Sequence, residues 1–365
     1  MDKKFVMGIA AMAALTLVSC SSDDLDSFSD NSSKNEAISF DGYLGRSAVA
    51  VNGTRGSVET VTTLKDKGFG VFSTHTGEAS FPDFANQQVT YKYSKWTYTP
   101  IKYWPTTPGT INFFAYAPYD KNTKLTENTK INFDVVHDVA GQKDLLWARV
   151  HAQIKTPITS TDNKVNFQFA HALSRLDYTI KLHDMYPSAK FTLNKITLAG
   201  SPDETTKAFY TKGTIDLSTT VKDPTSGATT GLWNTSLSSD KQNFDWVSES
   251  YKVESKEPND PKNYLFVIPQ NFSENIGTVE HPVENPDKLY IIVKYTINYD
   301  GGGEQINTVY KQIKKDFKQG KAYKINLTIG LPIEFDVNVD NGVDDWGADE
   351  NINIGSNENP WEGIK

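Results

Sequence analysis

The chain has 365 residues, of which 38% are hydrophobic and 12% aromatic, and its formal net charge is −8. This length suffices for about two domains, and the acidic balance repels phosphate backbones, so nucleic acid is excluded as a partner. The single cysteine, Cys20, excludes internal disulfides and thiolate metal sites.

The first 19 residues have the three parts of a secretory signal peptide. Two lysines follow the start, an apolar run extends from Phe5 to Val18, and the small Ser19 precedes the cysteine. The run is shorter than the roughly 20 residues that a transmembrane helix needs. Its ending, Leu17 to Cys20, resembles the lipobox of bacterial lipoproteins, in which the cysteine is acylated and becomes the mature N-terminus. We therefore predict a signal peptide over residues 1–19 and lipidation at Cys20, which anchors the protein to a membrane without spanning it.

An acidic, polar stretch follows the cysteine. Residues Ser21 to Asp24 resemble the export signal that sends lipoproteins of Bacteroides-like bacteria to the cell surface. Residues 20–36 as a whole are predicted to form a flexible tether. The predicted location is the cell outer membrane, on its exposed side.

Beyond the tether, apolar residues recur at every second position, which is typical of strands that bury one face. Helical periodicity is not sustained over 12 or more residues after the signal peptide. Asp300 to Glu304 contains three glycines and predicts a hairpin turn before Ile306 to Tyr310. We therefore predict an all-β chain of the sandwich type. The alternating runs are Ile38–Gly42, Val165–Phe169, Leu176–Leu182, Leu289–Tyr299, Tyr323–Ile329 and Ile333–Val339.

Polar breaks divide the predicted strands into blocks. Pro187 stands in a polar stretch after residue 183 and marks the best candidate junction. We predict an N-terminal β-sandwich domain over residues 37–184 and a C-terminal one over residues 185–346. Residues 347–365, rich in Asn, Glu and Gly, are expected to form a flexible tail.

Several motifs follow one another in an order that identifies a family. Together with the lipobox, they make the chain resemble the fimbrillin-like proteins of Bacteroides and Porphyromonas relatives, the pilus subunits called type V pilins. The resemblance covers most of the mature chain. The motifs are Gly68–Phe72, Tyr103–Pro105, Gly109–Tyr116, Gln142–Ala148, Phe169–Leu176 and the closing segment Tyr323–Trp346.

The resemblance implies two tandem transthyretin-like β-sandwich domains in a fimbrial subunit with a role in cell adhesion. In that family a lipoprotein precursor reaches the surface, and an arginine-specific protease then removes the first strand. A strand from another subunit fills the groove, a process called donor-strand exchange. The implied partners are other copies or related pilin subunits, the surface protease, the membrane through the lipid anchor, and a glycan or host-surface ligand.

Two arginines follow the first predicted strand and are candidate processing sites. Arg55, before Gly56, has the more polar and loop-like approach and is preferred; Arg46, before Ser47, is the runner-up. An ordinary exposed loop arginine is the alternative interpretation of both. Two strands, Tyr323–Ile329 and Ile333–Val339, qualify equally as the donor.

No motif in the chain predicts catalysis. The six histidines lack metal-ligand spacing, and His171 is predicted to be a hydrogen-bonded core or edge residue. The acidic run from Asp336 lacks the glycine and glutamate that an EF-hand needs. We predict no enzyme, no metal and no cofactor, while a weak calcium site from Asp344, Asp345 and Asp349 stays open beside a solvated acidic turn.

A second function is compatible with the same leader and fold: a surface glycan-binding lipoprotein of a nutrient-uptake system. Aromatic side chains exposed in a row can stack on sugar rings. The most suggestive group is Trp96, Tyr98, Tyr103 and Trp104. Core packing of these residues is the competing interpretation.

Overall fold

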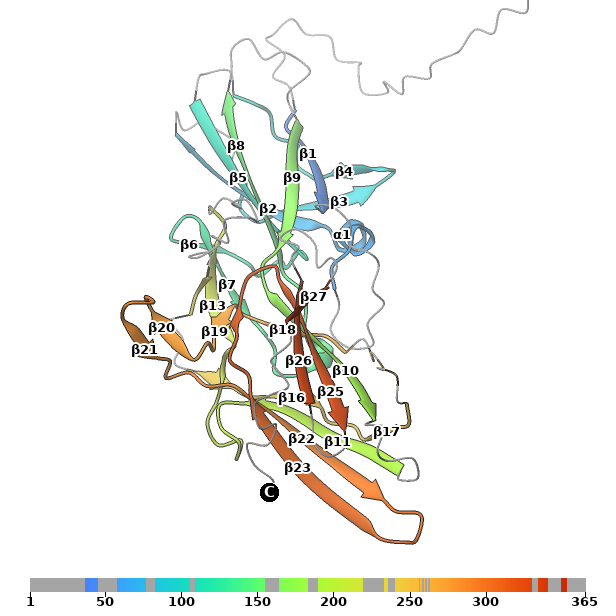
Figure 1. The fold of residues 1–365 in the computed structure, drawn as a ribbon. Coiled ribbons are helices and arrows are strands. Elements are labelled where there is room, and N and C mark those ends of the chain that lie inside the picture. The colour runs from blue at the N-terminus through green and yellow to red at the C-terminus, as the bar shows by residue number, and fades with distance from the viewer. Residues whose placement is uncertain are drawn as a thin grey trace, which may run out of the picture. The chain divides into compact units, whose positions relative to one another are not determined.

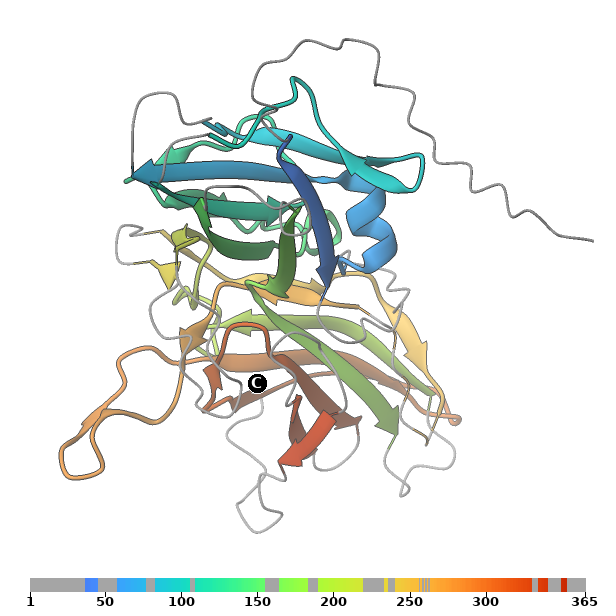
Figure 2. The ribbon, with the colours of Figure 1, turned by 90° about the horizontal axis from the view of Figure 1, so that it is seen from above.

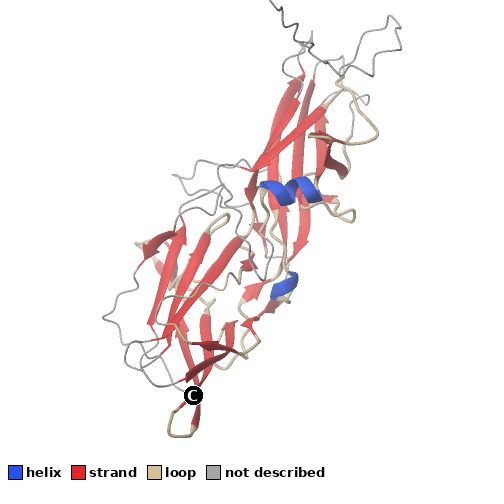
Figure 3. Ribbon diagram, turned by 90° about the vertical axis from the view of Figure 1, so that its right-hand side faces the viewer, coloured by secondary structure: helices blue, strands red, loops and turns tan. Residues whose placement is uncertain are grey.

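Strands dominate the protein (Figure 3). The computed structural model describes residues 37–44, 58–76, 83–105, 109–154, 164–182, 190–218, 233–235, 240–255, 257, 259, 261, 263–329, 334–340 and 349–352. For residues 151–154, 334–340 and 349–352 it describes the backbone alone. The prediction of an all-β chain is confirmed.

The first sheet has seven strands in the order β1-β9-β8-β5-β2-β3-β4 (Figure 1). β1 pairs parallel to β9, whereas the other neighbours pair antiparallel. The two ends of this order also meet, because β1 contacts β4 and the N–H of Ile38 donates to the carbonyl of Lys102 (2.8 Å). The strands thus curl around a core of their own that is rich in phenylalanine. Their bounds are β1 Ser39–Leu44, β2 Phe69–Thr76, β3 Gln87–Lys92, β4 Lys95–Thr97, β5 Gly109–Ala117, β8 Leu146–Ile154 and β9 Lys164–His171.

Two further sheets share a second core. One has the order β18-β10-β25-β26-β27, and the other has β16-β11-β22-β23 with β17 also paired to β11. Tyr178 of the first sheet packs edge-to-face on Trp246 of the second, with ring centroids 5.1 Å apart. Facing sheets with one shared core form a β-sandwich. The bounds are β10 Ser174–Leu182, β11 Lys190–Ala199, β16 Phe244–Val247, β17 Tyr251–Val253, β18 Leu265–Val267, β22 Tyr290–Asn298, β23 Glu304–Gln312, β25 Ala322–Ile329, β26 Glu334–Asp340 and β27 Asp349–Ile352.

Shorter strands complete the fold. A four-stranded sheet has the order β14-β13-β7-β6, and three two-stranded ribbons are β12-β15, β19-β24 and β20-β21. β7 lies between β5 and β8 in the chain, yet it pairs with β13, which follows β11. β10, which precedes residue 184, shares a sheet with β25. The division at residue 184 stays a prediction. The bounds are β6 Leu125–Thr126, β7 Lys130–Asp134, β12 Phe209–Tyr210, β13 Lys212–Asp216, β14 Trp233–Asn234, β15 Lys241–Gln242, β19 Gln270–Asn271, β20 Asn275–Gly277, β21 Pro282–Glu284 and β24 Asp316–Phe317.

Among the described residues, two helical segments interrupt the strands: α1 (Val61–Lys67) and the 3-10 turn η1 (Val139–Gly141). Thr60 and Thr63 form a reciprocal capping box at the start of α1, which satisfies backbone N–H groups that a helix start leaves unpaired. Gly68 ends the helix with a φ of 70°, and a Cβ there would lie 2.3 Å from the carbonyl oxygen of Val89. Only Leu64 of α1 is buried, so this short helix gives no apolar periodicity.

The alternation along β22 and the hairpin after it agree with the predictions from the sequence. Ile291, Val293, Tyr295 and Ile297 are buried, and β23 pairs with β22 along its whole length. The turn between them needs glycine, because Gly302 and Gly303 have φ values of 84° and 122°.

Candidate functional site

The candidate site is β1 together with the slot that holds it, at the end of the first sheet's strand order (Figure 2). Six residues of β1 are in register with six of β9, from Ser39 opposite Lys164 to Leu44 opposite Phe169. On its other side, β1 bonds to the segment that follows β4. The N–H of Ile38 donates to Lys102, and the carbonyl of Ile38 accepts from the Tyr98 hydroxyl at 2.8 Å. Backbone groups on both flanks therefore hold this short strand.

The inward side chains of β1 and of Ile38, the residue before it, fill the first core. Ile38, Phe40 and Leu44 are buried, with 1%, 3% and 6% of their surface exposed. The Phe40 ring is the centre of this contact: it lies 5.2–5.8 Å, centroid to centroid, from four other rings. Aromatic pairs at such distances add stabilisation beyond their buried area. The rings are those of Phe84, Tyr98, Phe113 and Phe167.

Gly42 is the third inward position, and its lack of a side chain lets the strand approach two rings. A Cβ there would lie 2.9 Å from Cε1 of Phe69 and 3.2 Å from Cε2 of Phe169. Both distances are shorter than ordinary carbon contacts. The order Ile38, Phe40, Gly42, Leu44 is therefore matched to the shape of the slot.

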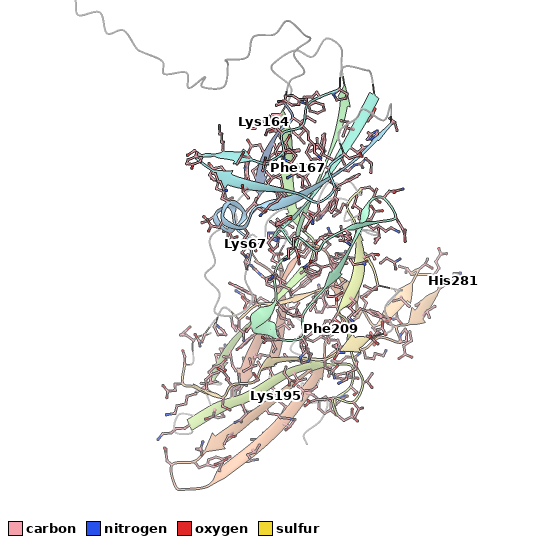
Figure 4. All side chains as sticks on the ribbon, turned by 180° about the vertical axis from the view of Figure 1, so that it is seen from behind. Lys67, Lys164, Phe167, Lys195, Phe209 and His281 are labelled. Carbon is pink, nitrogen blue, oxygen red and sulfur yellow. The ribbon has the colours of Figure 1, made fainter. Side chains whose placement is uncertain are left out.

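The outward side chains of β1 hold it weakly. Ser39 and Tyr43 are exposed, and Asp41 pairs with Lys164 at 2.6 Å on the surface (Figure 4). An exposed ion pair of this kind contributes about 0–1 kcal/mol. Strand retention thus depends on the buried rings and the backbone bonds.

Tyr98 is the residue of this site whose role the sequence did not indicate. Its pKa is raised by burial, so the hydroxyl keeps its proton and donates to β1. Trp104 packs edge-to-face on Phe113 and is buried, Trp96 is half-buried, and Tyr103 is 52% exposed. Two of the four rings that could stack on sugars therefore belong to the core.

The two candidate donor strands differ in position. β25 lies between β10 and β26 and buries Tyr323, Ile325, Leu327 and Ile329, so it cannot leave without opening the sandwich core. β26 pairs with β25 on one side and with β27 on the other, and β27 ends the strand order. The pair β26 and β27 thus lies at one end of this strand order, whereas β25 is in its middle.

The predicted lipidation and processing residues lie outside the described residues. These are Cys20, the pair Arg46 and Ser47, and the pair Arg55 and Gly56. Both arginines fall in residues 45–57, which join β1 to the rest of the fold. Asp344 and Asp345 also lie outside, and of Asp349 only the backbone is described. Over the residues that are described, no three His, Cys, Asp or Glu side chains gather as metal ligands do.

A buried polar cluster surrounds Glu59, which lies just before α1. Asp144 accepts from the backbone N–H of Glu59 (3.1 Å), and His171 Nδ1 lies 2.8 Å from the same carboxylate oxygen. Lys67 pairs with Glu59, whose pKa is nevertheless raised by burial and, less strongly, by Asp144. His171 is therefore a hydrogen-bonded core residue. The cluster ties the start of α1 to the ends of β8 and β9.

No helix in the described part of the chain has the length and hydropathy needed to cross a bilayer. The fold and the slot define the class: an all-β sandwich protein whose first strand sits at a sheet edge in a fitted groove. A model of the family described as fimbrillin-like matches residues 54–346. The chain belongs to the fimbrillin-like family.

The chain is similar to several known proteins. The fimbrium subunit Fim1C of Phocaeicola vulgatus is 29% identical over 194 residues, which span 46% of this chain and about half of that relative (49%). A fimbrial protein from Bacteroides vulgatus shares the fold, with a TM-score of 0.59, 20% identity, and coverage of 84% of this chain and 99% of that one. A putative cell adhesion protein from Bacteroides uniformis aligns with a TM-score of 0.43 and 16% identity over 85% of this chain and 99% of its own.

Proposed function

We propose that the protein is a structural subunit of a surface fimbria, with a role in cell adhesion and no catalytic role. The observation that carries the proposal is β1, a short edge strand held in a fitted, ring-lined groove and joined to the fold through residues 45–57. Membership of the fimbrillin-like family and the similarity to a fimbrium subunit support it. Its partners are then other copies of this chain or related pilin subunits.

We propose donor-strand exchange at the β1 slot as the mode of assembly. Burying each of the three apolar side chains Ile38, Phe40 and Leu44, in and directly before β1, contributes about 1.5–3 kcal/mol. Ordering its backbone costs about 1–2 kcal/mol per residue. These opposing terms are of the same order, so a nicked β1 is not held permanently. A strand of matching pattern from another subunit can replace it, with the same backbone bonds and pockets.

Processing between β1 and α1 releases the strand in this scheme. An arginine-specific surface protease cuts after Arg55, or after Arg46 as the runner-up, and leaves β1 attached only to the lipidated Cys20 segment. The subunit then leaves its anchor at the outer membrane and joins the fimbrium. Until that cut, β1 covers an edge that would otherwise pair indiscriminately.

The donor is the C-terminal strand region, β26 with β27. Its edge position supports this choice over β25, whose side chains are fixed in the sandwich core. We further propose that the N-terminal sandwich, residues 37–184, receives the strand and that the C-terminal sandwich, residues 185–346, presents it.

Limited trypsin treatment of the chain without residues 1–19 tests processing and assembly. We expect a ladder of multimers on an unheated denaturing gel after cleavage. Arg46→Ala combined with Arg55→Ala should abolish the ladder, because residues 45–57 contain no other trypsin site, whereas Arg46→Ala alone should leave it. A ladder that persists in Arg55→Ala and disappears in Arg46→Ala would move the site to Arg46. A lasting monomer after proven cleavage would contradict a polymerising role.

A further inference from the structure

A pocket of about 760 Å³ lies in the connection between β5 and β8. It falls within the range of about 300–1,000 Å³ that is usual for ligand sites. Its wall on one side is the loop after β5 and on the other side β7, while Ile131, Val135 and Leu145 contribute core side chains to its lining. The pocket shares no residue with the β1 slot.

The outer edge of β7 gives the pocket free backbone groups. Val135 donates to Thr211 and Leu217 donates to Thr129, so odd-numbered residues of β7 direct their N–H and C=O groups to β13. Residues 132 and 134 consequently direct theirs to the other side. There β6 pairs with Lys130 and Ile131 only, and no described strand continues beyond them. Donors and acceptors are therefore left facing the pocket.

Side chains around this edge add further polar groups. Asn132, Asp134 and Lys143 are exposed pocket residues. Within the described part of the chain they make no side-chain hydrogen bond or ion pair. Two half-buried rings, Tyr119 and Phe133, also line the pocket. The site thus combines unused amide and carboxylate groups with aromatic faces.

The charges of the pocket balance. Its lining contains two acidic residues, Asp120 and Asp134, and two basic residues, Lys121 and Lys143. Such a lining does not favour a ligand of one sign. It suits a ligand whose groups both donate and accept and which has an apolar face for a ring, and the hydroxyls and C–H face of a sugar meet both conditions.

We propose that this pocket binds a short, neutral oligosaccharide, which gives the subunit an adhesive site of its own. Asn132 and Asp134, with the free edge of β7, bond the hydroxyls. Tyr119 packs against a sugar ring. Binding at this site does not require assembly, because the single subunit contains the whole pocket.

A glycan array probed with the chain lacking residues 1–19 tests the proposal, followed by calorimetric titration of the best neutral glycan. Asp134→Asn and Tyr119→Ala should each weaken binding about tenfold or more, since the first replaces a charged acceptor by a neutral amide and the second removes the ring contact to the sugar. Glu127→Gln is the matched control: it removes an exposed carboxylate from the turn between β6 and β7 without touching the pocket, and should bind as the parent does.

Circular dichroism and melting temperatures check that the variants remain folded. The trypsin-induced ladder should be unchanged in Asp134→Asn, which separates this proposal from the assembly mechanism. Binding that survives in both pocket variants, binding confined to sialylated or sulfated glycans, or no bound neutral glycan would overturn the proposal.

Discussion

Phe40 is the residue on which retention of β1 depends most. Its ring contacts four other rings and is 3% exposed. Phe40→Ala removes those contacts and leaves a cavity, a change that usually costs about 3–5 kcal/mol. We expect hydrogen exchange of residues 38–44 to accelerate strongly while the C-terminal sandwich stays protected.

Asp41→Asn is the matched control on the same strand. It removes the exposed ion pair to Lys164. The free energy of opening of β1, measured by hydrogen exchange, should therefore change by less than about 1 kcal/mol. Equal acceleration in both variants would show that the ring cluster does not hold β1.

Tyr98 makes a smaller, testable contribution. Tyr98→Phe keeps the ring and deletes the hydroxyl that donates to Ile38. The loss should be at least about 1 kcal/mol, the usual net value of one hydrogen bond, because the hydroxyl also accepts from the N–H of Lys102. It should appear as roughly fivefold faster exchange in β1, measured by mass spectrometry. Unchanged exchange would mean that the bond adds nothing to strand retention.

Glu59 should make stability depend on pH. Its pKa is raised above the usual 4.5 by burial, so the folded state holds the proton more tightly than the unfolded state. Its contribution is fully present below about pH 4.5 and is lost as the pH rises through the folded-state pKa. The melting temperature of Glu59→Gln, relative to the parent, should therefore increase with pH across that window. A difference that shrinks as the pH rises would contradict the assignment.

At the scale of elements, β26 and β27 form the proposed donor region. We expect deletion of residues 334–365 to abolish the multimer ladder and to leave a folded monomer, because this removes β26 and β27 and spares β25. Deletion of residues 353–365 alone is the control and should leave the ladder intact. A ladder in the larger deletion would place the donor elsewhere.

The sequence predicted those elements that depend on residues close together in the chain. Alternation gave the strands β1, β9, β10, β22 and β25, and three consecutive glycines gave the turn before β23. The helix α1 escaped prediction because a seven-residue helix with one buried residue shows no period. The pairing of β7 with β13 joins residues some 80 apart, and no local pattern indicates it.

The features of the candidate site were likewise predicted only where they depend on neighbouring residues. The strand from Ile38 to Gly42 was predicted from its alternation, and its inward residues are buried as expected. Its parallel pairing with β9, the hydroxyl of Tyr98 and the close approach at Gly42 arise from tertiary contacts. For Trp104 the sequence left sugar stacking and core packing open, and the side chain is buried against Phe113.

At the scale of the whole molecule, the sequence before β1 and the fold after it have separate roles in the proposed mechanism. In that proposed mechanism, residues 20–36, beginning with the predicted lipidation site Cys20, supply a membrane address, and β1 keeps the groove closed until the proposed processing. The second core and the β5–β8 pocket lie in the part that stays in the fimbria. Anchor, assembly and adhesion thus depend on different residues, and each can be altered alone.

Replacement of β1 by another subunit's strand is tested most directly by a controlled cut. A recognition sequence for a site-specific protease replaces residues 47–54, so that cleavage separates β1 from a fold that has already formed. After cleavage, we predict a ladder of multimers that excess free peptide of residues 37–45 suppresses. The same peptide with Phe40→Ser should not suppress it. A cleaved subunit that stays monomeric, or a ladder that both peptides leave unchanged, would contradict the mechanism.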